Sequence, residues 1–384
     1  MHKIAASKLC NGCHTCYSVC PKSCIIMIEG KEGFLEPLID KTKCIDCKIC
    51  VNKCPINNAL TDNKVENNTV KSIVAINKDD IIRKNSSSGG VFSELANYIL
   101  DQNGVVYGVG FDDNFEVEHM KITNKNEICK LQGSKYVQSK IGDIFFDIKN
   151  ELENKKLVLF TGTPCQVEGL LSFLGKPYEN LYTQDIICHG VPSPKAWRKY
   201  INEFNEDIKS ISFRDKTYGW LNFSVKIESQ DNKYINTKDI FLQSFLKNLN
   251  LRKSCYNCKF KKINRNSDIT LADCWGIENI DKKFFDDKGT SLVILHSDKG
   301  EFLYNEIKSK FISSSISLEE AIKYNTAINK SVEMTNARSK FFKNIDKYNY
   351  KEVFQKSIDI TPHEKIKIFL SRTKRKIKKL LKVI

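Results

Sequence analysis

The sequence lacks any run of about 20 uncharged apolar residues, so we expect no membrane-spanning segment. Its first nine residues are too short and polar for a secretory signal peptide, which predicts a cytoplasmic protein. Long low-complexity segments are absent too. With 41% hydrophobic and 28% charged residues among 384, the chain can form cores, which excludes a disordered protein and a small disulfide-stapled scaffold. This length predicts two or three domains of about 100–200 residues each.

Cysteine is abundant: there are fifteen, of which nine lie between Cys10 and Cys54. In a reducing cytoplasm, cysteines are more often metal ligands or redox groups than disulfides. Two runs of the form C-x2-C-x2-C-x3-C-P, at residues 10–21 and 44–55, repeat at an offset of 34 residues. Such a run wraps three thiolates around one iron–sulfur cube and sends the fourth to the neighbouring cube.

Residues 1–60 are therefore predicted to hold two [4Fe–4S] clusters. One set of ligands is Cys10, Cys13, Cys16 and Cys54, and the other is Cys44, Cys47, Cys50 and Cys20. Zinc also accepts four thiolates, but zinc sites seldom use two such runs with crossed connectivity. Cys24 is expected to fill the core of this segment. The segment resembles bacterial-type two-cluster ferredoxins over its whole length, which implies a small fold of two pseudo-symmetric halves.

The remaining sequence predicts a larger mixed α/β domain over residues 71–360, after a polar linker at 61–70. Strand and helix signals alternate, which favours α/β or α+β architecture. Strands are expected at 72–76, 105–111, 157–161, 182–187 and 291–296, and helices at 90–100 and from 164 to 174.

A second set of cysteines lies in this domain. Cys165 and Cys188 follow the ends of two predicted strands, where α/β sheets bind ligands. Cys255 and Cys258 form a CxxC pair, which fits half a zinc site, a dithiol couple or two cluster ligands. These four could act together, although Cys274 has metal-like spacing as a rival ligand. Cys129 is expected to be a half-buried bystander.

Two polar segments are candidates for binding a phosphate. Ser86-Ser-Ser-Gly-Gly90 precedes the helix predicted at 90–100, and a capped helix N-terminus with glycines favours an anion. Residues 132–139, including Lys135, add an ammonium group with hydroxyl and amide groups. An ordinary helix cap and a polar surface loop are the alternatives.

Seven motifs occur together in a fixed order: Ser87-Ser-Gly-Gly-Val-Phe, Gly133-Ser-Lys-Tyr-Val-Gln-Ser, Thr161-Gly-Thr-Pro-Cys-Gln, Ile187-Cys-His-Gly-Val-Pro-Ser, Ser212-Phe-Arg-Asp-Lys, Cys255-Tyr-Asn-Cys-Lys-Phe and Asp268-Ile-Thr-Leu-Ala-Asp-Cys-Trp-Gly. With them the chain resembles, over residues 1 to about 300, the family of coenzyme F420 hydrogenase/dehydrogenase β-subunits. The resemblance is to bacterial members with a fused ferredoxin, which often occur beside polysaccharide-biosynthesis enzymes.

This resemblance implies an α/β flavin domain that binds FAD next to a third [4Fe–4S] cluster. By motif, Ser88, Gly89, Gly90 and Lys135 would contact the flavin nucleotide. Cys165, Cys188, Cys255 and Cys258 would hold the third cluster, with Cys274 a spare thiol.

We expect an iron–sulfur flavoprotein oxidoreductase. Electrons would pass between the clusters and, through FAD, a two-electron small-molecule substrate, since a flavin accepts electrons singly or in pairs. The redox partner would be ferredoxin or a deazaflavin- or nicotinamide-type carrier, and the substrate would belong to polysaccharide biosynthesis. His189, Arg214 and Lys216 are candidates for binding an anionic substrate, or else ordinary surface residues.

Two rival functions remain open. The first is a non-catalytic electron-transfer subunit of a larger redox complex. The second is a zinc-stabilised nucleic-acid-binding protein, suggested by the net charge of +15, against which the twin cysteine runs argue. The charge is concentrated: residues 365–384 hold nine Lys and Arg and no acidic residue. We therefore expect no nucleic-acid partner.

The C-terminal tail, residues 361–384, has apolar residues at helical spacing opposite its basic face. Such a helix docks at the inner face of a membrane or on a partner protein, and the sequence does not choose between them.

Overall fold

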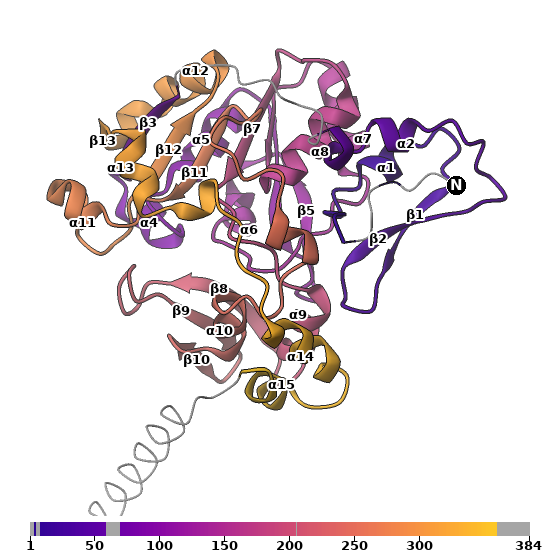
Figure 1. Ribbon diagram of the computed structural model, residues 1–384. Helices are drawn as coiled ribbons and strands as arrows, with labels where there is room; N and C mark the ends of the chain where they lie inside the picture. Colours follow the sequence, from indigo (N-terminus) through magenta and orange to yellow (C-terminus); the bar gives the residue numbers. More distant parts are fainter. Residues whose placement is uncertain (1–3, 5–7, 59–69, 205, 359–384) are drawn as a thin grey trace, which may run out of the picture.

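An eight-stranded mixed sheet organises most of the chain (Figure 1). The computed structural model describes residues 4, 8–58, 70–204 and 206–358. The strand order is β13-β3-β12-β11-β7-β6-β4-β5, and the central strands β4, β6, β7 and β11 are parallel. The strands are β3 (Lys71–Asn77), β4 (Val105–Phe111), β5 (Val117–Ile122), β6 (Val158–Thr161), β7 (Leu181–Ile186), β11 (Ile269–Asp273), β12 (Ser291–Leu295) and β13 (Phe311–Ser315).

Helices cover both faces of this sheet, so its central strands are largely buried; most of their residues are apolar, and β7 also buries Thr183, Gln184 and Asp185. In β6, Leu159 packs toward α5 and α12, while Phe160 packs toward α7 and α8. The predicted strands and the helix at 90–100 are present, with ends shifted by at most one residue, which confirms the mixed α/β class. The helices around the sheet are α4 (Asp80–Asn85), α5 (Val91–Asp101), α6 (Ile128–Leu131), α7 (Ile144–Glu153), α8 (Pro164–Leu174), α11 (Ile277–Ile280), α12 (Asp298–Ile307) and α13 (Leu318–Lys323).

A smaller antiparallel sheet lies below the main one in Figure 1. It consists of β8 (Ile208–Asp215), β9 (Ser224–Ser229) and β10 (Lys233–Asn236), packed with α9 (Pro194–Ile201), α10 (Ile240–Leu246), α14 (Asn336–Asn344) and α15 (Tyr350–Ser357). Its core is aromatic, with Trp197, Phe213, Phe241 and Tyr350 fully buried. Short 3-10 turns complete the body at Lys125–Glu127, Lys253–Asn257, Lys282–Phe284, Lys308–Lys310 and Thr326–Ile328.

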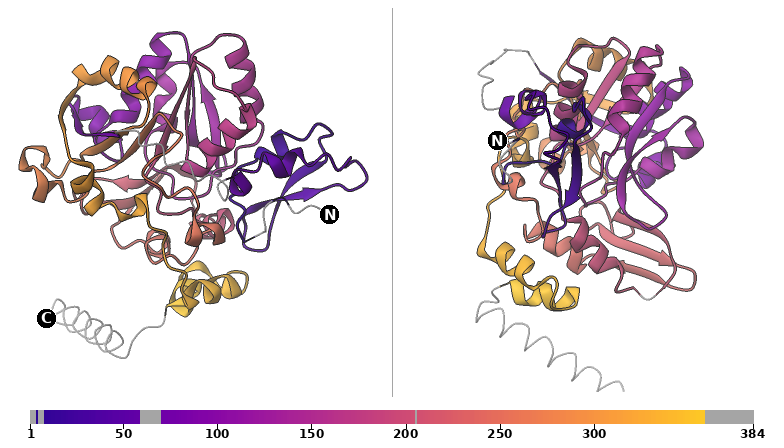
Figure 2. Two further views of the ribbon diagram at one scale, coloured as in Figure 1. Left: turned by 45° about the horizontal axis from the view of Figure 1, so that its top comes forward. Right: turned by 90° about the vertical axis from the view of Figure 1, so that its right-hand side faces the viewer.

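The N-terminal module projects from one side of the body, next to α7 and α8 (Figures 1 and 2). It contains α1 (Thr15–Ser18), the hairpin of β1 (Ile25–Glu29) and β2 (Leu35–Ile39), α2 (Ile49–Asn52) and α3 (Pro55–Asn58). His14 and Lys48, which are equivalent in the two repeats, both adopt a left-handed backbone, with φ of 63° and 62°. The repeated sequence thus produces a repeated local structure.

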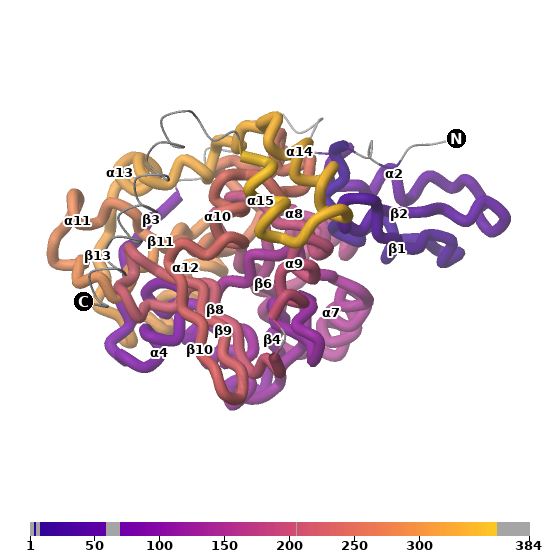
Figure 3. The backbone as a smooth tube through the Cα atoms, turned by 90° about the horizontal axis from the view of Figure 1, so that it is seen from below, coloured from indigo at the N-terminus to yellow at the C-terminus, as the bar shows by residue number. Residues whose placement is uncertain are grey.

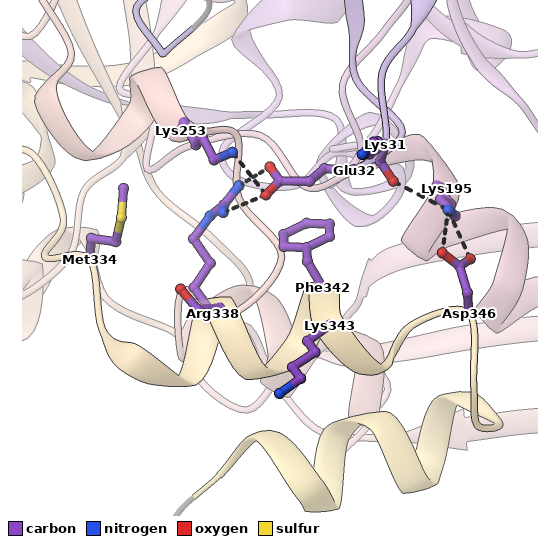
Figure 4. A pocket seen from close by; sticks show the side chains of 10 residues that line it. Lys31, Glu32, Lys195, Lys253, Met334, Arg338, Phe342, Lys343 and Asp346 are labelled. Carbon is purple, nitrogen blue, oxygen red and sulfur yellow. Dashed lines mark hydrogen bonds and ion pairs between the residues drawn. The ribbon is translucent and has the colours of Figure 1, made fainter.

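The C-terminal helices hold the tip of the module's hairpin. Seen from below, α14 lies beside the module (Figure 3). Arg338 of α14 donates two hydrogen bonds to the carboxylate of Glu32, at 3.0 and 2.6 Å, and Lys253 pairs with the same group at 3.1 Å (Figure 4). Lys195 bridges the carbonyl of Lys31 and the carboxylate of Asp346. The hairpin is therefore tied to the body by charged groups.

Two predicted segments fall outside the described residues: the tail at 361–384 and positions 61–69 of the linker. Across the ranges that the structure describes, no helix is both long and apolar enough to cross a bilayer.

Candidate iron–sulfur and flavin sites

Four cysteines from distant parts of the chain line one cavity at the carboxyl ends of the parallel strands. Cys165 is in the first turn of α8 and Cys188 follows β7. Cys255 and Cys258 come from the turn at Lys253–Asn257 and its end. The structure therefore brings together the set that the family resemblance implies for a third cluster.

Two opposing effects act on the thiol of Cys165: the start of α8 favours its thiolate form and burial opposes it. Thr163 and Gln166 form a capping box at the start of α8, and Pro164 occupies its first turn. The positive end of the helix dipole then lies at Cys165, whose Sγ is 3.2 Å from the hydroxyl of Thr163. Burial nevertheless raises the pKa of Cys165 well above its usual value, so the protein part alone keeps this thiol protonated.

Cations balance the charge that four thiolates would bring. Burial raises the pKa of Cys188 to about 12 and that of Cys255 to about 11. Lys261, Arg265 and Arg252 line the same cavity. This positively charged lining would stabilise the negative charge of an iron–sulfur cluster with four thiolates.

The other two cysteines of the body lie elsewhere. Cys274 is fully buried in an apolar cluster with Trp220 and Ile277, away from the cavity. Cys129 was expected to be half-buried, but it is exposed, because the short helix α6 turns it outward, and its Sγ donates to the carbonyl of Asn126 at 3.3 Å.

In the N-terminal module the cysteines form two groups with the crossed membership expected from the sequence. Cys54 lies within electrostatic reach of Cys10, Cys13 and Cys16. Cys20 lies within such reach of Cys50, next to Cys44 and Cys47.

A cube binds one thiolate at each of four irons, so its ligands surround a space instead of one ion. Within the described ranges, no three His, Cys, Asp or Glu side chains are arranged around a single metal ion.

Cys24 fills the module's core, at 4% exposure, and also contacts the second group. Its Sγ is 3.3 Å from that of Cys20. Burial by itself would raise the pKa of Cys20, but backbone N–H groups of Cys24, Lys22 and Ser23 point to its sulfur and lower the pKa overall. These groups are suited to hold Cys20 as a ligand thiolate.

The first cysteine group of the module and the cavity of the body are neighbours. Cys16, Cys54, Cys165, Cys258 and the buried Phe260 belong to one apolar cluster, and Asn11, next to Cys10, lines the cavity of the body. The structure thus places two predicted cluster sites side by side across the interface between module and body.

Arg252 fixes this interface. Its guanidinium donates to the carbonyls of Cys10 and Leu35, at 2.6 and 2.9 Å, and to the amide oxygen of Gln138 at 2.8 Å. Gln138 in turn donates to the carbonyl of Asn11 at 2.8 Å. One buried cation therefore links both module segments to the wall of the cavity.

The predicted flavin loop is built against the opposite half of the sheet. Gly90 caps α5 with φ of 90°, and a Cβ on Gly89 would lie 2.3 Å from the carbonyl oxygen of Ala75, so no larger residue fits there. Ser88 donates to the carbonyl of Thr290 at 2.7 Å. Ser87 contacts Ser134 at 2.9 Å, so the structure joins the two polar segments that the sequence singled out.

Lys135 does not point freely into an open site. Its ammonium group donates to the carbonyls of Lys130 and Gln132, at 3.0 and 2.8 Å. Burial lowers its pKa to about 7. An anion bound beside Lys135 would favour the charged form of its side chain.

Arg214, which is buried, and Lys216, which is half-buried, both donate to carbonyls of the predicted flavin loop. Arg214 is 5% exposed, forms a bidentate pair with Asp273 at 2.8 and 3.0 Å, and donates to the carbonyl of Ser87. Lys216 donates to the carbonyl of Ser88 at 2.9 Å, and burial lowers its pKa to about 7. The Nε of Arg214 is buried with no partner, which leaves one donor for a bound group.

His189 lies apart from this pair. Its Nε2 is 2.7 Å from the amide oxygen of Asn248, and its ring packs edge-on against Phe245. Burial lowers its pKa. Of the three predicted substrate residues, Arg214 and Lys216 thus bond to the Ser/Gly loop, whereas His189 bonds to Asn248.

Sequence reasoning missed Arg252, which lines the cavity, and His119, which lies beside the strand that leads to Cys165. His119 stacks on Phe160 and contacts the carbonyl of Thr161 at 3.1 Å, just before the Cys165 turn. Arg252 lies three residues before Cys255, and this position was the one available signal. His119 carried none, because it comes from a separate strand.

Comparisons with known proteins agree with this geometry. The family descriptions "Coenzyme F420 hydrogenase/dehydrogenase, beta subunit" match in their N-terminal part at residues 72–145 and in their C-terminal part at 155–320. A "4Fe-4S dicluster domain" matches residues 9–79, which confirms the iron–sulfur character predicted for the N-terminal segment.

Individual relatives match parts of the chain. An uncharacterised protein of Methanocaldococcus jannaschii is 28% identical over 233 residues, covering 52% of this chain and 63% of the relative. A subunit of the F420H2 dehydrogenase of Methanosarcina mazei is 23% identical over 167 residues, covering 41% of this chain and 46% of that relative. The chain thus spans less than two thirds of either relative.

A chain of the F420-reducing [NiFe] hydrogenase complex from Methanosarcina barkeri aligns with a TM-score of 0.47 at 17% identity, covering 69% of this chain and 96% of that one. The two family matches span most of the body and include the cavity cysteines. The chain belongs to the family of coenzyme F420 hydrogenase/dehydrogenase β-subunits and carries an N-terminal 4Fe–4S dicluster domain.

Proposed function

We propose that this protein is an iron–sulfur flavoprotein that exchanges electrons between a one-electron partner and a two-electron organic substrate. The observation that carries the proposal is that the first cysteine repeat of the module lies against the cavity cysteines of the body, with Asn11 in the cavity lining and Cys13 beside Gly169 of α8. Adjacent redox centres are what electron transfer through a protein needs, and no such adjacency would serve a zinc-stabilised fold.

The ligands in this proposal follow the observed groups. Cys10, Cys13, Cys16 and Cys54 hold the first [4Fe–4S] cluster, Cys20, Cys44, Cys47 and Cys50 hold the second, and Cys165, Cys188, Cys255 and Cys258 hold the third. When bound, these clusters supply one-electron transfer at potentials that burial and hydrogen bonds to sulfur adjust. The chain's own contribution is to bury the third set among cations and to exclude water from the interface.

FAD is the second cofactor in the proposal. Ser88, Gly89 and Gly90 would bind its phosphates at the start of α5, with Lys135 as a counter-charge. The orphaned Nε of Arg214, beside this loop, fits a group bound there. FAD supplies the exchange between single electrons and electron pairs.

Iron, sulfide and flavin analysis after anaerobic purification tests this proposal. Roughly twelve irons and one flavin per chain are expected. The variant Cys188→Ser should lose about four irons, and the matched control Cys274→Ala should lose none, since Cys274 lies outside the cavity. Equal losses in both variants, or a colourless zinc protein, would contradict the cluster assignment.

The rival function is a non-catalytic electron-transfer subunit, favoured by the relative that is itself a subunit of an F420H2 dehydrogenase. Reduction of a deazaflavin or nicotinamide carrier by the purified chain alone would favour the flavoenzyme. Clusters without flavin, and no turnover without a second chain, would favour the subunit. The family resemblance extends the proposal to a substrate of polysaccharide biosynthesis, and glycan precursors in the same assay test that step.

A further inference from the structure

The two cysteine repeats have the same sequence pattern but opposite surroundings. In the first repeat, Asn11, His14 and Thr15 are 8%, 3% and 0% exposed, because the body covers them. Their equivalents in the second repeat, Ile45, Lys48 and Ile49, are all exposed, with Ile45 at 58%. The first repeat of the module is thus covered by the body, and the second repeat is open to solvent.

The second repeat forms a continuous exposed stretch, residues 41–49, which we call the exposed cysteine loop. Cys44 and Cys47 are both exposed within it. The isoleucines at 45 and 49 are exposed large apolar side chains in the same loop as Cys44 and Cys47. In Figure 1 this part of the chain lies on the side of the module that faces away from the body.

Basic side chains surround these isoleucines. Lys41, Lys43 and Lys48 are exposed in the loop, and Lys22 is exposed next to Cys20, whose sulfur its backbone N–H approaches. The acidic groups on the same face are Asp46 and Asp40, and Asp40 is already engaged by the N–H and hydroxyl of Thr42 and by Lys43 at 3.6 Å. The balance on this face is positive.

We propose that the exposed cysteine loop, with Lys22, is the docking surface for a small acidic electron-carrier protein. Complementary charge selects and orients such a partner, and the isoleucines supply the apolar contact at the centre of a transient interface. The inference rests on the proposed function, because it takes Cys20, Cys44, Cys47 and Cys50 as the ligands of the outermost cluster. It adds which face meets the partner and which charge the partner carries.

The transfer at this surface is balanced in electrons. The reduced carrier would lose one electron, and a cluster held by Cys20, Cys44, Cys47 and Cys50 would gain that electron, with no bond made or broken and no proton moved. The reverse transfer uses the same surface. The opposite repeat cannot serve, because Arg252, Gln138 and α8 already occupy its environment.

Charge reversal tests the inference. With an acidic plant-type [2Fe–2S] ferredoxin as probe, the holoprotein and its variant Lys43→Glu/Lys48→Glu are compared for binding by calorimetry and for reduction by stopped flow. At low salt the variant should bind at least about tenfold more weakly and be reduced about tenfold more slowly. At about 0.5 M salt the difference should disappear, because the charges are then screened.

The matched control is Lys308→Glu/Lys310→Glu, which makes the same charge change beside β13, at an edge of the sheet remote from the module. It should behave as the wild type. A second variant, Ile45→Ser, should weaken binding by a factor that salt does not alter.

Iron content and reduction by dithionite separate this inference from the proposed function. If the wild type contains no clusters, the proposed function fails. If clusters are present and reducible in every variant, but the loop reversal binds the ferredoxin as the wild type does, the docking inference alone is overturned. It is also overturned if the control loses as much affinity, or if the loop binds anionic phosphatidylserine vesicles and not the ferredoxin.

Discussion

Replacing Arg252 by methionine should detach the first cysteine repeat from the body. Arg252 is 3% exposed and makes three hydrogen bonds, to Cys10, Leu35 and Gln138, while its plane lies over the ring of Phe34 at 5.3 Å. Methionine keeps most of the volume and removes the charge and every donor.

The magnitude follows from the buried acceptors. A hydrogen bond from a charged donor contributes about 1.5–3 kcal/mol, and such bonds are not additive when they share one donor group. Two backbone carbonyls and one amide oxygen lose their partner, and the apolar packing around Phe260 restricts access of water to this interface. We therefore expect a loss of about 3–5 kcal/mol in the free energy that holds the module to the body.

Hydrogen–deuterium exchange measures this loss. Each 1.4 kcal/mol is a factor of ten, so amides protected by docking should exchange about 10² to 4 × 10³ times faster in Arg252→Met. The affected peptides are those of residues 9–19 and 34–39, whose carbonyls Arg252 binds. Arg252→Lys keeps the charge without the fork and should show an intermediate rate.

The reasoning is refuted if Arg252→Met retains its iron and exchanges at these peptides within about threefold of the wild type, a difference well under the 1.4 kcal/mol of one decade. If Arg252→Met loses iron, faster exchange could come from loss of the cluster instead of loss of docking. The comparison with Arg252→Lys would identify that case.

Three further predictions concern the module and the residues around the cavity. Gly169→Ala places a Cβ 2.9 Å from the hydroxyl of Thr15 and 3.0 Å from the Cβ of Cys13. Overpacking between α8 and the module costs about 1–3 kcal/mol, against a gain of about 1 kcal/mol in helix propensity, so the melting temperature should fall; a rise would contradict the contact. Arg338→Met leaves Glu32 with Lys253 alone and should increase proteolysis of the hairpin tip at 30–33, whereas unchanged digestion would show that the pair contributes nothing. Burial lowers the pKa of His119 to about 4 from 6.5, so at pH values between these two the unfolded chain binds a proton that the folded chain does not. The free energy of unfolding should therefore fall as the pH drops below 6.5, by about 2 kcal/mol at pH 5. His119→Gln should remove this part of the decrease in melting temperature between pH 7.5 and 5, and an identical decrease in both proteins would exclude a contribution from His119.

The two cysteine sets differ in how far sequence could identify them. The N-terminal runs were recognisable because each places three ligands within seven residues, so the chain itself enforces their convergence. Cys165 and Cys188 were recognisable in part, since both follow apolar strands whose parallel ends must share one edge. The pairing with Cys255 and Cys258, and the exclusion of Cys274, came from family resemblance and not from spacing.

Local patterns determined the elements, the repeated cysteine module and the mixed α/β class, because strand and helix periodicity and short ligand spacings are properties of neighbouring residues. Only the tertiary structure decided how these parts meet. The tertiary structure buries Cys274 in an apolar core and directs Arg214 and Lys216 at the carbonyls of the Ser/Gly loop. It also brings Cys16 and Cys54 into one apolar cluster with Cys165, Cys258 and Phe260. It also buried one repeat and exposed the other, although their sequences follow one pattern. These outcomes depend on packing between residues more than 100 positions apart, which no local pattern encodes.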